Sequence, residues 1–80
     1  MRRSTPEDGD VVVREEMRDG RRVYVLHTAP GPGQILLRTR DAALAQARKF
    51  ARHQGVRVWL ADGDVEFALV DDFRANGEAT

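Results

Sequence analysis

Residues 39–55, TRDAALAQARKFARHQG, constrain the fold more than any other stretch, because they carry every signal of an α-helix. Thr39 suits the N-cap position, where its hydroxyl accepts a hydrogen bond from an amide of the first turn. Gly55 suits the residue after the helix, where a left-handed backbone closes the last turn. The apolar residues in between recur with the helical period. They are Ala43, Leu44, Ala47, Phe50 and Ala51. We therefore predict a helix over residues 40–54.

This apolar stripe consists mostly of alanine, so the helix is expected to lie close to a sheet that supplies most of the core volume. Leu44 and Phe50 are its large side chains. Both are predicted to dock onto the sheet.

Residues 10–17 and 22–28 are rich in β-branched residues and flank Asp19-Gly20, a strong hairpin signal. A two-residue loop pairs position 17 with 22, 15 with 24, 13 with 26 and 11 with 28. One side of this hairpin then carries the more apolar residues and should face the helix. A proline-containing loop at 29–33 leads to a short third strand at 34–38, expected beside the second.

After the helix, residues 56–61 and 65–70 are predicted to form a second hairpin around Asp62-Gly63. A two-residue loop would pair position 60 with 65, 58 with 67 and 56 with 69. Phe67 and Leu69 would then share the helix side of the sheet with Val58.

The order β-β-β-α-β-β predicts an α+β fold of two layers, an antiparallel sheet with a single helix (about 40–54) packed on one face. Residues 1–9 are expected to be a disordered tail, 10–72 a single domain, and 73–80 a frayed tail.

Eighty residues without cysteine exclude disulfides and thiolate metal sites. No apolar run is long enough to cross a membrane, and the N-terminus lacks the hydrophobic core of a signal peptide. We expect a cytoplasmic protein without membrane association.

The net charge is zero, but the charges are segregated along the chain. Residues 38–57 hold six bases against one acid, whereas residues 62–78 hold six acids against one base. The first segment thus carries +5 and the second −5. Such polarity suits head-to-tail association as well as polyanion binding.

The sheet face opposite the helix is the first candidate site, because a contiguous apolar group with a tryptophan usually marks a contact surface. This candidate interaction face consists of Val12, Val23, Val25, Leu36, Arg57 and Trp59. The alternative is that long charged side chains screen these residues, with Trp59 packed under Arg57.

The basic side of the helix is the second candidate, a polyanion-binding strip on which Trp59 would stack with a base. Its residues are Arg38, Arg40, Arg48, Lys49, Arg52 and Arg57. The alternative is an ordinary solvated face.

Catalytic and metal-binding patterns are absent from the sequence. His27 and His53 lack further ligands at metal-binding spacing, and Ser4, the single serine, sits in the expected tail. We expect no catalytic residues, no metal, no cofactor and no enzymatic activity.

The helix and the strands around it resemble a family of short bacterial domains of unknown function, over roughly residues 23–67. The matching residues are Thr39, Ala43, Ala47, Arg48, Ala51, Arg52, Gly55, Val58, Asp62 and Gly63. The resemblance implies a strand–strand–helix–strand–strand fold and no catalytic residues.

Together these patterns predict a small non-catalytic interaction module that self-associates, as a homodimer, through the exposed sheet face or a sheet edge. Binding of a different protein partner is a second possibility. The alternative is an accessory nucleic-acid-binding domain that uses the basic helix face, which the zero net charge makes the weaker hypothesis.

Overall fold

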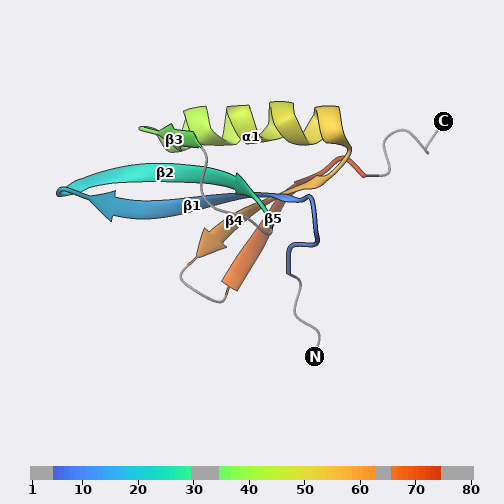
Figure 1. The fold of residues 1–80 in the computed structure, drawn as a ribbon, viewed down its shortest axis with the longest axis horizontal. Helices are drawn as coiled ribbons and strands as arrows, with labels where there is room; N and C mark the ends of the chain where they lie inside the picture. The colour runs from blue at the N-terminus through green and yellow to red at the C-terminus, as the bar shows by residue number, and fades with distance from the viewer. Residues whose placement is uncertain (1–4, 30–34, 63–65, 75–80) are drawn as a thin grey trace.

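The predicted fold class and element order are confirmed by the structure, a computed structural model that describes residues 5–29, 35–62 and 66–74. One helix packs against a five-stranded sheet (Figure 1). The elements are β1 (Val11–Arg18), β2 (Arg21–Thr28), β3 (Ile35–Leu37), α1 (Arg40–Gln54), β4 (Arg57–Asp62) and β5 (Glu66–Asp72).

The helix begins and ends as its capping residues predict. Thr39 Oγ1 accepts a hydrogen bond from the Ala42 amide at 3.1 Å. Gly55 has φ 72°, and its amide donates to the Ala51 carbonyl at 2.7 Å. Both ends therefore satisfy backbone groups that a bare helix terminus leaves unpaired.

The first hairpin has the predicted register, from Val11 opposite Thr28 to Met17 opposite Arg22. Asp19 and Gly20 both have positive φ, at 52° and 76°. Two consecutive positive φ angles are what a tight two-residue hairpin turn requires. The local turn chemistry therefore set the register of the whole ribbon.

The strand order in the sheet is β3-β2-β1-β4-β5. Four neighbouring strand pairs hold it together, and the β1–β4 pair is parallel, so the sheet is mixed rather than wholly antiparallel. The parallel pair arises because α1 carries the chain from β3 at one edge across β2 and β1 to β4. Parallel neighbours need such a long crossover.

The main core lies between α1 and the sheet, where Ala43, Ala47 and Ala51 are completely buried. Leu44 packs against this core, as predicted. The sheet contributes residues from three strands. They are Val11, Val13, Tyr24, Leu26 and Val58.

The prediction that Phe50 docks onto the sheet is wrong, since 38% of this residue is exposed. At about 100° per residue, Phe50 lies roughly 60° from the centre of the alanine stripe. Leu44 lies at the same angle on the opposite flank of the stripe and packs against the core, so the sheet covers the Leu44 flank of the helix and leaves the Phe50 flank open. Val70 and Phe73 pack against the core instead.

The register predicted for the second hairpin is also wrong. Asp62 pairs with Glu66, so three residues (63–65) separate the strands, and that loop, with Gly63, lies outside the described residues. An odd change in loop length moves every side chain of a strand to the other face. Phe67 consequently lies opposite Ala61, on the side away from α1.

A bulge in β5 then changes the pairing of the second hairpin again. Trp59 pairs with Leu69 but Val58 pairs with Asp71, which leaves Val70 as the extra residue on β5. Val70 packs against the core under α1. Leu69 stays on the other face and is 50% exposed.

Candidate functional site

Asp10, directly before β1, is the centre of a buried polar network that joins the N-terminal segment to β4. Its residue exposure is only 2%. Oδ2 accepts hydrogen bonds from Trp59 Nε1 at 2.9 Å, from Arg57 Nε at 3.0 Å and from the Glu7 amide at 3.0 Å. Oδ1 accepts from the Arg57 amide at 3.1 Å. The carboxylate thereby satisfies four donors from two distant parts of the chain.

The ionised form of Asp10 is favoured by these bonds. Burial raises the pKa of this carboxyl, but the hydrogen bonds from the Glu7 amide, Trp59 and the Arg57 amide, together with the Arg57 charge, outweigh burial. The pKa of Asp10 therefore lies below its ordinary value. At neutral pH the carboxylate is charged and paired with a guanidinium, which points to a stabilising role.

Trp59 and Arg57 are not part of an exposed surface, which corrects the expectation for the candidate interaction face. Trp59 is 1% exposed, and the guanidinium of Arg57 lies 4.9 Å from its ring centroid. The Phe67 ring meets Trp59 edge-on at 6.5 Å between centroids. The alternative weighed from the sequence, Trp59 packed under Arg57, is the arrangement observed.

The rest of the candidate interaction face divides between a buried centre and an open end. Val12 and Val25 are buried, so they too are not exposed as expected. Val23 is half-buried, and Leu36 is 53% exposed. The uncovered side of the sheet therefore carries its own small core around Trp59, and the open apolar surface remains at the β2–β3 end.

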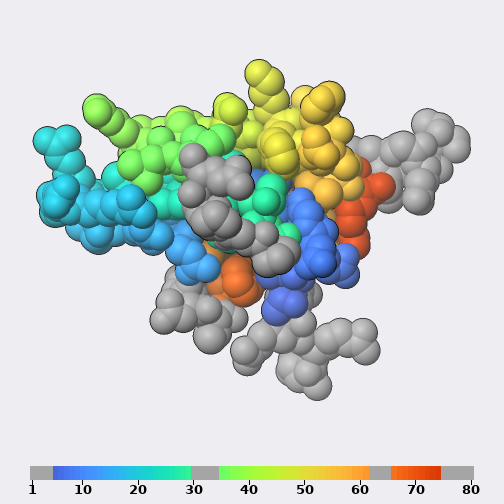
Figure 2. Space-filling view, in the orientation of Figure 1, coloured from blue at the N-terminus to red at the C-terminus, as the bar shows by residue number. Residues whose placement is uncertain are grey.

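That open end is a groove with a basic lining. Val23 and Leu36 share it with charged residues of the hairpin tip, which extends beyond the start of α1 (Figure 2). Its charged residues are Arg18, Asp19, Arg21, Arg22 and Arg38. Sequence reasoning identified Arg38 and Leu36 but placed them on separate surfaces. The alternation of residues 18, 21 and 23 along the predicted hairpin could have revealed the groove.

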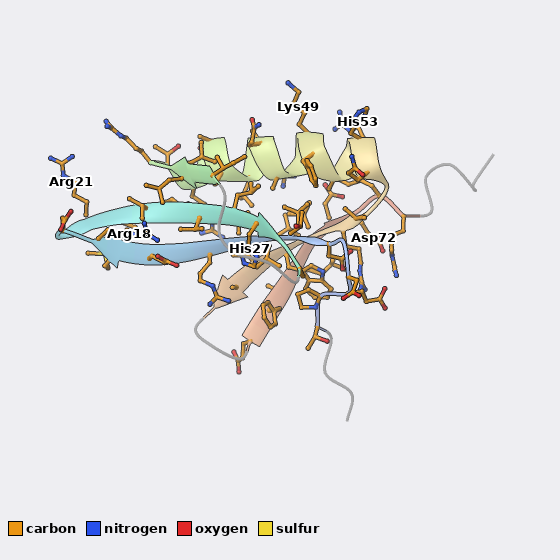
Figure 3. The ribbon with its side chains drawn as sticks, in the orientation of Figure 1. Arg18, Arg21, His27, Lys49, His53 and Asp72 are labelled. Atoms are coloured by element: carbon orange, nitrogen blue, oxygen red, sulfur yellow. The ribbon has the colours of Figure 1, made fainter. Side chains whose placement is uncertain are left out.

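The arginines of this groove differ in how they are paired. Arg18 bonds to Glu16 at 2.9 Å, and Arg22 forms an ion pair with Glu15. None of the described residues forms an ion pair with Arg21 or Arg38. Arg21 projects from the tip of the hairpin (Figure 3). Two of the groove's arginines, Arg21 and Arg38, therefore have no ion-pair partner among the described residues.

The two edges of the sheet expose most of the large apolar surface of the described chain. Five large apolar residues are exposed in the described ranges, and three of these belong to the edge strands β3 and β5. They are Ile35 and Leu36 on β3, and Leu69 on β5. The β5 edge also carries Glu66, Asp71 and Asp72, whereas arginines follow β3.

The predicted polyanion-binding strip does not form one surface. Arg57 is mostly covered and paired with Asp10, and Arg38 belongs to the groove. Arg48 lies 3.4 Å from Asp71 in an ion pair, and Arg52 sits over the Phe73 ring at 5.5 Å. Arg40 and Lys49 are exposed.

A smaller cationic concavity on the outer side of α1 was not anticipated. It is lined by residues from the second half of the helix. They are Gln46, Lys49, Phe50, Arg52 and His53. Lys49 and His53 project from this outer side, away from the sheet (Figure 3). The error over Phe50 hid this site, because Phe50 was assigned to the core.

Within the described parts of the chain, no helix is long and apolar enough to span a membrane. No family model, curated protein or solved structure matches the chain. The resemblance to short bacterial domains therefore stays a prediction.

Proposed function

We propose that this chain is a small, non-catalytic, cytoplasmic interaction module that self-associates head to tail, with the β3 edge of one copy against the β5 edge of the next. The observation that carries the proposal is the placement of exposed apolar residues: Ile35 and Leu36 on one edge strand, Leu69 on the other. The buried state of Trp59 and Val12 favours the edges over the centre of the sheet face.

The backbone geometry supports joining these two edges. An edge strand presents unpaired amide and carbonyl groups that can pair with another chain. Since β3 runs parallel to β1 and β5 runs antiparallel to it, β3 of a second copy in the same orientation would run antiparallel to β5. Leu36 and Leu69 both lie on the side away from α1, so the joined sheet would place them on one face.

The charges favour unlike edges over like edges. Two β5 edges would bring Glu66 of one copy near Asp72 of the other, and like charges across a strand pair are destabilising. In the joined sheet, Arg38 and Arg40 after β3 would instead lie near the acids of β5, of which Asp71 and Asp72 pair with Arg48 and Arg74 within their own chain. A heterologous contact of this kind forms a dimer first and longer chains at higher concentration, unless it closes into a ring.

Light scattering coupled to size-exclusion chromatography tests the proposal over a range of concentrations at low and high salt. We expect the mean mass to rise with concentration, and to rise less at high salt because the edges carry opposite charges. Leu36→Lys and Leu69→Lys should each reduce the mass to that of a monomer. Met17→Lys is the matched control, because Met17 is 64% exposed but lies at the hairpin tip.

Mixing the two edge variants distinguishes unlike from like edges. Leu69→Lys keeps an intact β3 edge and Leu36→Lys keeps an intact β5 edge, so their mixture should form a dimer that does not grow. If Leu36→Lys alone still associates, the contact does not use β3. A strict monomer at the highest concentration, with a folded wild-type chain, refutes self-association.

A further inference from the structure

We propose that the outer side of α1 is a stacking site for single-stranded nucleic acid, with Phe50 as the aromatic platform and Lys49 and Arg52 as the phosphate contacts. The site uses neither edge strand, so it stands or falls independently of self-association.

The placement of Phe50 is the first observation. Phe50 is 38% exposed, whereas the completely buried positions of the same helix are occupied by alanines. It shares a concavity with Gln46, Lys49 and His53, which recur at helical spacing on the side away from the sheet. A large apolar ring is therefore partly exposed to water among polar side chains.

The charge of the lining is the second observation. Among the described residues, the lining contains Lys49, Arg52 and His53 and no carboxylate. Arg52 is held in place over the Phe73 ring, whereas Arg48, on the same helix, is already paired with Asp71. The C-terminal end of a helix carries a partial negative charge, which disfavours an anion. The attraction for an anion at this site must therefore come from the basic side chains.

An exposed ring flanked by cations matches the chemistry of single-stranded nucleic acid, in which bases stack on aromatic faces while basic residues follow the phosphates. A membrane surface would require several large apolar residues along the outer side of the helix. Of the described residues of α1, Phe50 is the exposed large apolar one. The sequence suggested Trp59 as the stacking residue, and in the structure Phe50 is the ring available for that role.

Fluorescence anisotropy with a labelled oligothymidine, and with an abasic oligonucleotide of the same length, tests the proposal. We expect the full-length chain to bind oligothymidine at least about fivefold more tightly, as one aromatic–base stack implies. Phe50→Leu should remove this difference and leave the affinity for the abasic strand unchanged. Lys49→Gln should weaken both strands alike and lower the salt slope by about one.

Arg21→Gln is the matched control, because it removes an exposed cation of the groove and should leave both affinities unchanged. Several results would overturn the proposal. They are equal affinity for the two strands, an unaltered preference in Phe50→Leu, an effect of Arg21→Gln as large as that of Lys49→Gln, or tighter binding to polyglutamate or anionic phospholipid vesicles. The emission of Trp59 checks that each variant is folded, since this buried residue is the single tryptophan.

Discussion

Replacing Asp10 tests how much the buried network stabilises the fold. Asp10→Ala removes an acceptor that satisfies Trp59 Nε1, Arg57 Nε and two backbone amides. Arg57 keeps only 12% of its side chain exposed, so its charge would remain largely buried, with the exposed Glu7 carboxylate, 3.4 Å away, as its remaining ion-pair partner. Removing one member of a buried ion pair costs about 3–5 kcal/mol.

That loss is large compared with the stability of a chain of this size. At about 0.05–0.15 kcal/mol per residue, a domain of 80 residues has roughly 4–12 kcal/mol in total. Asp10→Ala should therefore lower the free energy of unfolding by at least about a quarter of its wild-type value. The stability of Asp10→Asn should lie between those of the wild type and Asp10→Ala. The side-chain oxygen of Asn still accepts hydrogen bonds, but its NH2 group would face the Arg57 amide, and the substitution removes the negative charge.

Urea unfolding followed by Trp59 fluorescence measures both variants directly. The control is Asp8→Ala, which removes an exposed carboxylate two positions earlier and should leave the midpoint nearly unchanged. If Asp10→Ala stays within about 1 kcal/mol of the wild type, with the same dependence on urea, the network contributes little and the reasoning fails.

Three further predictions concern pH, packing and backbone strain. Because the folded state lowers the pKa of Asp10, the stability that this carboxylate contributes is present above its unfolded pKa of about 4 and is lost as the pH falls through its folded pKa. Urea midpoints measured across acid pH should show this loss of stability, and Asp10→Asn should lack the part of the loss that Asp10 causes. Ala47→Leu should cost about 1–3 kcal/mol, because Ala47 is completely buried between helix and sheet; an unchanged urea midpoint would show that the interface has room. Gly55→Ala should cost about 1–2 kcal/mol, since a Cβ would meet nothing within 4 Å but the φ of 72° is unfavourable for L residues; thermal unfolding measures it, and a wild-type melting temperature would contradict the strain argument.

The parts of the fold that follow from local chemistry could be predicted from the sequence. Thr39 and Gly55 act on their own helix ends, and Asp19-Gly20 acts on its own hairpin, so neighbouring residues were sufficient evidence. Asp62-Gly63 was not sufficient, because the same dipeptide is compatible with loops of different length. One unforeseen loop residue moved Phe67 to the opposite face, and the bulge then altered the pairing again.

The burial of individual side chains depended on distant elements and could be predicted only in part. Val58 faces the helix as expected, but Phe50 and Trp59 exchanged their expected environments. Asp10 was missed because its partners Arg57 and Trp59 lie 47 and 49 residues away in the sequence. The signal available in the sequence was a single acid directly before three consecutive valines. A carboxylate at the start of a buried strand needs hydrogen-bond donors, so this position indicated a buried polar network.

The parallel pairing of β1 with β4 has a consequence for the order in which the chain folds. Val11 lies opposite Val58, so this contact closes a loop that contains β2, β3 and α1. Closing a long loop costs conformational entropy before any contact rewards it, whereas the first hairpin closes over two residues. The hairpin should therefore form early, and the docking of β4 should limit the folding rate. Since Trp59 meets Asp10 only after that docking, its fluorescence in a stopped-flow experiment reports the slow step.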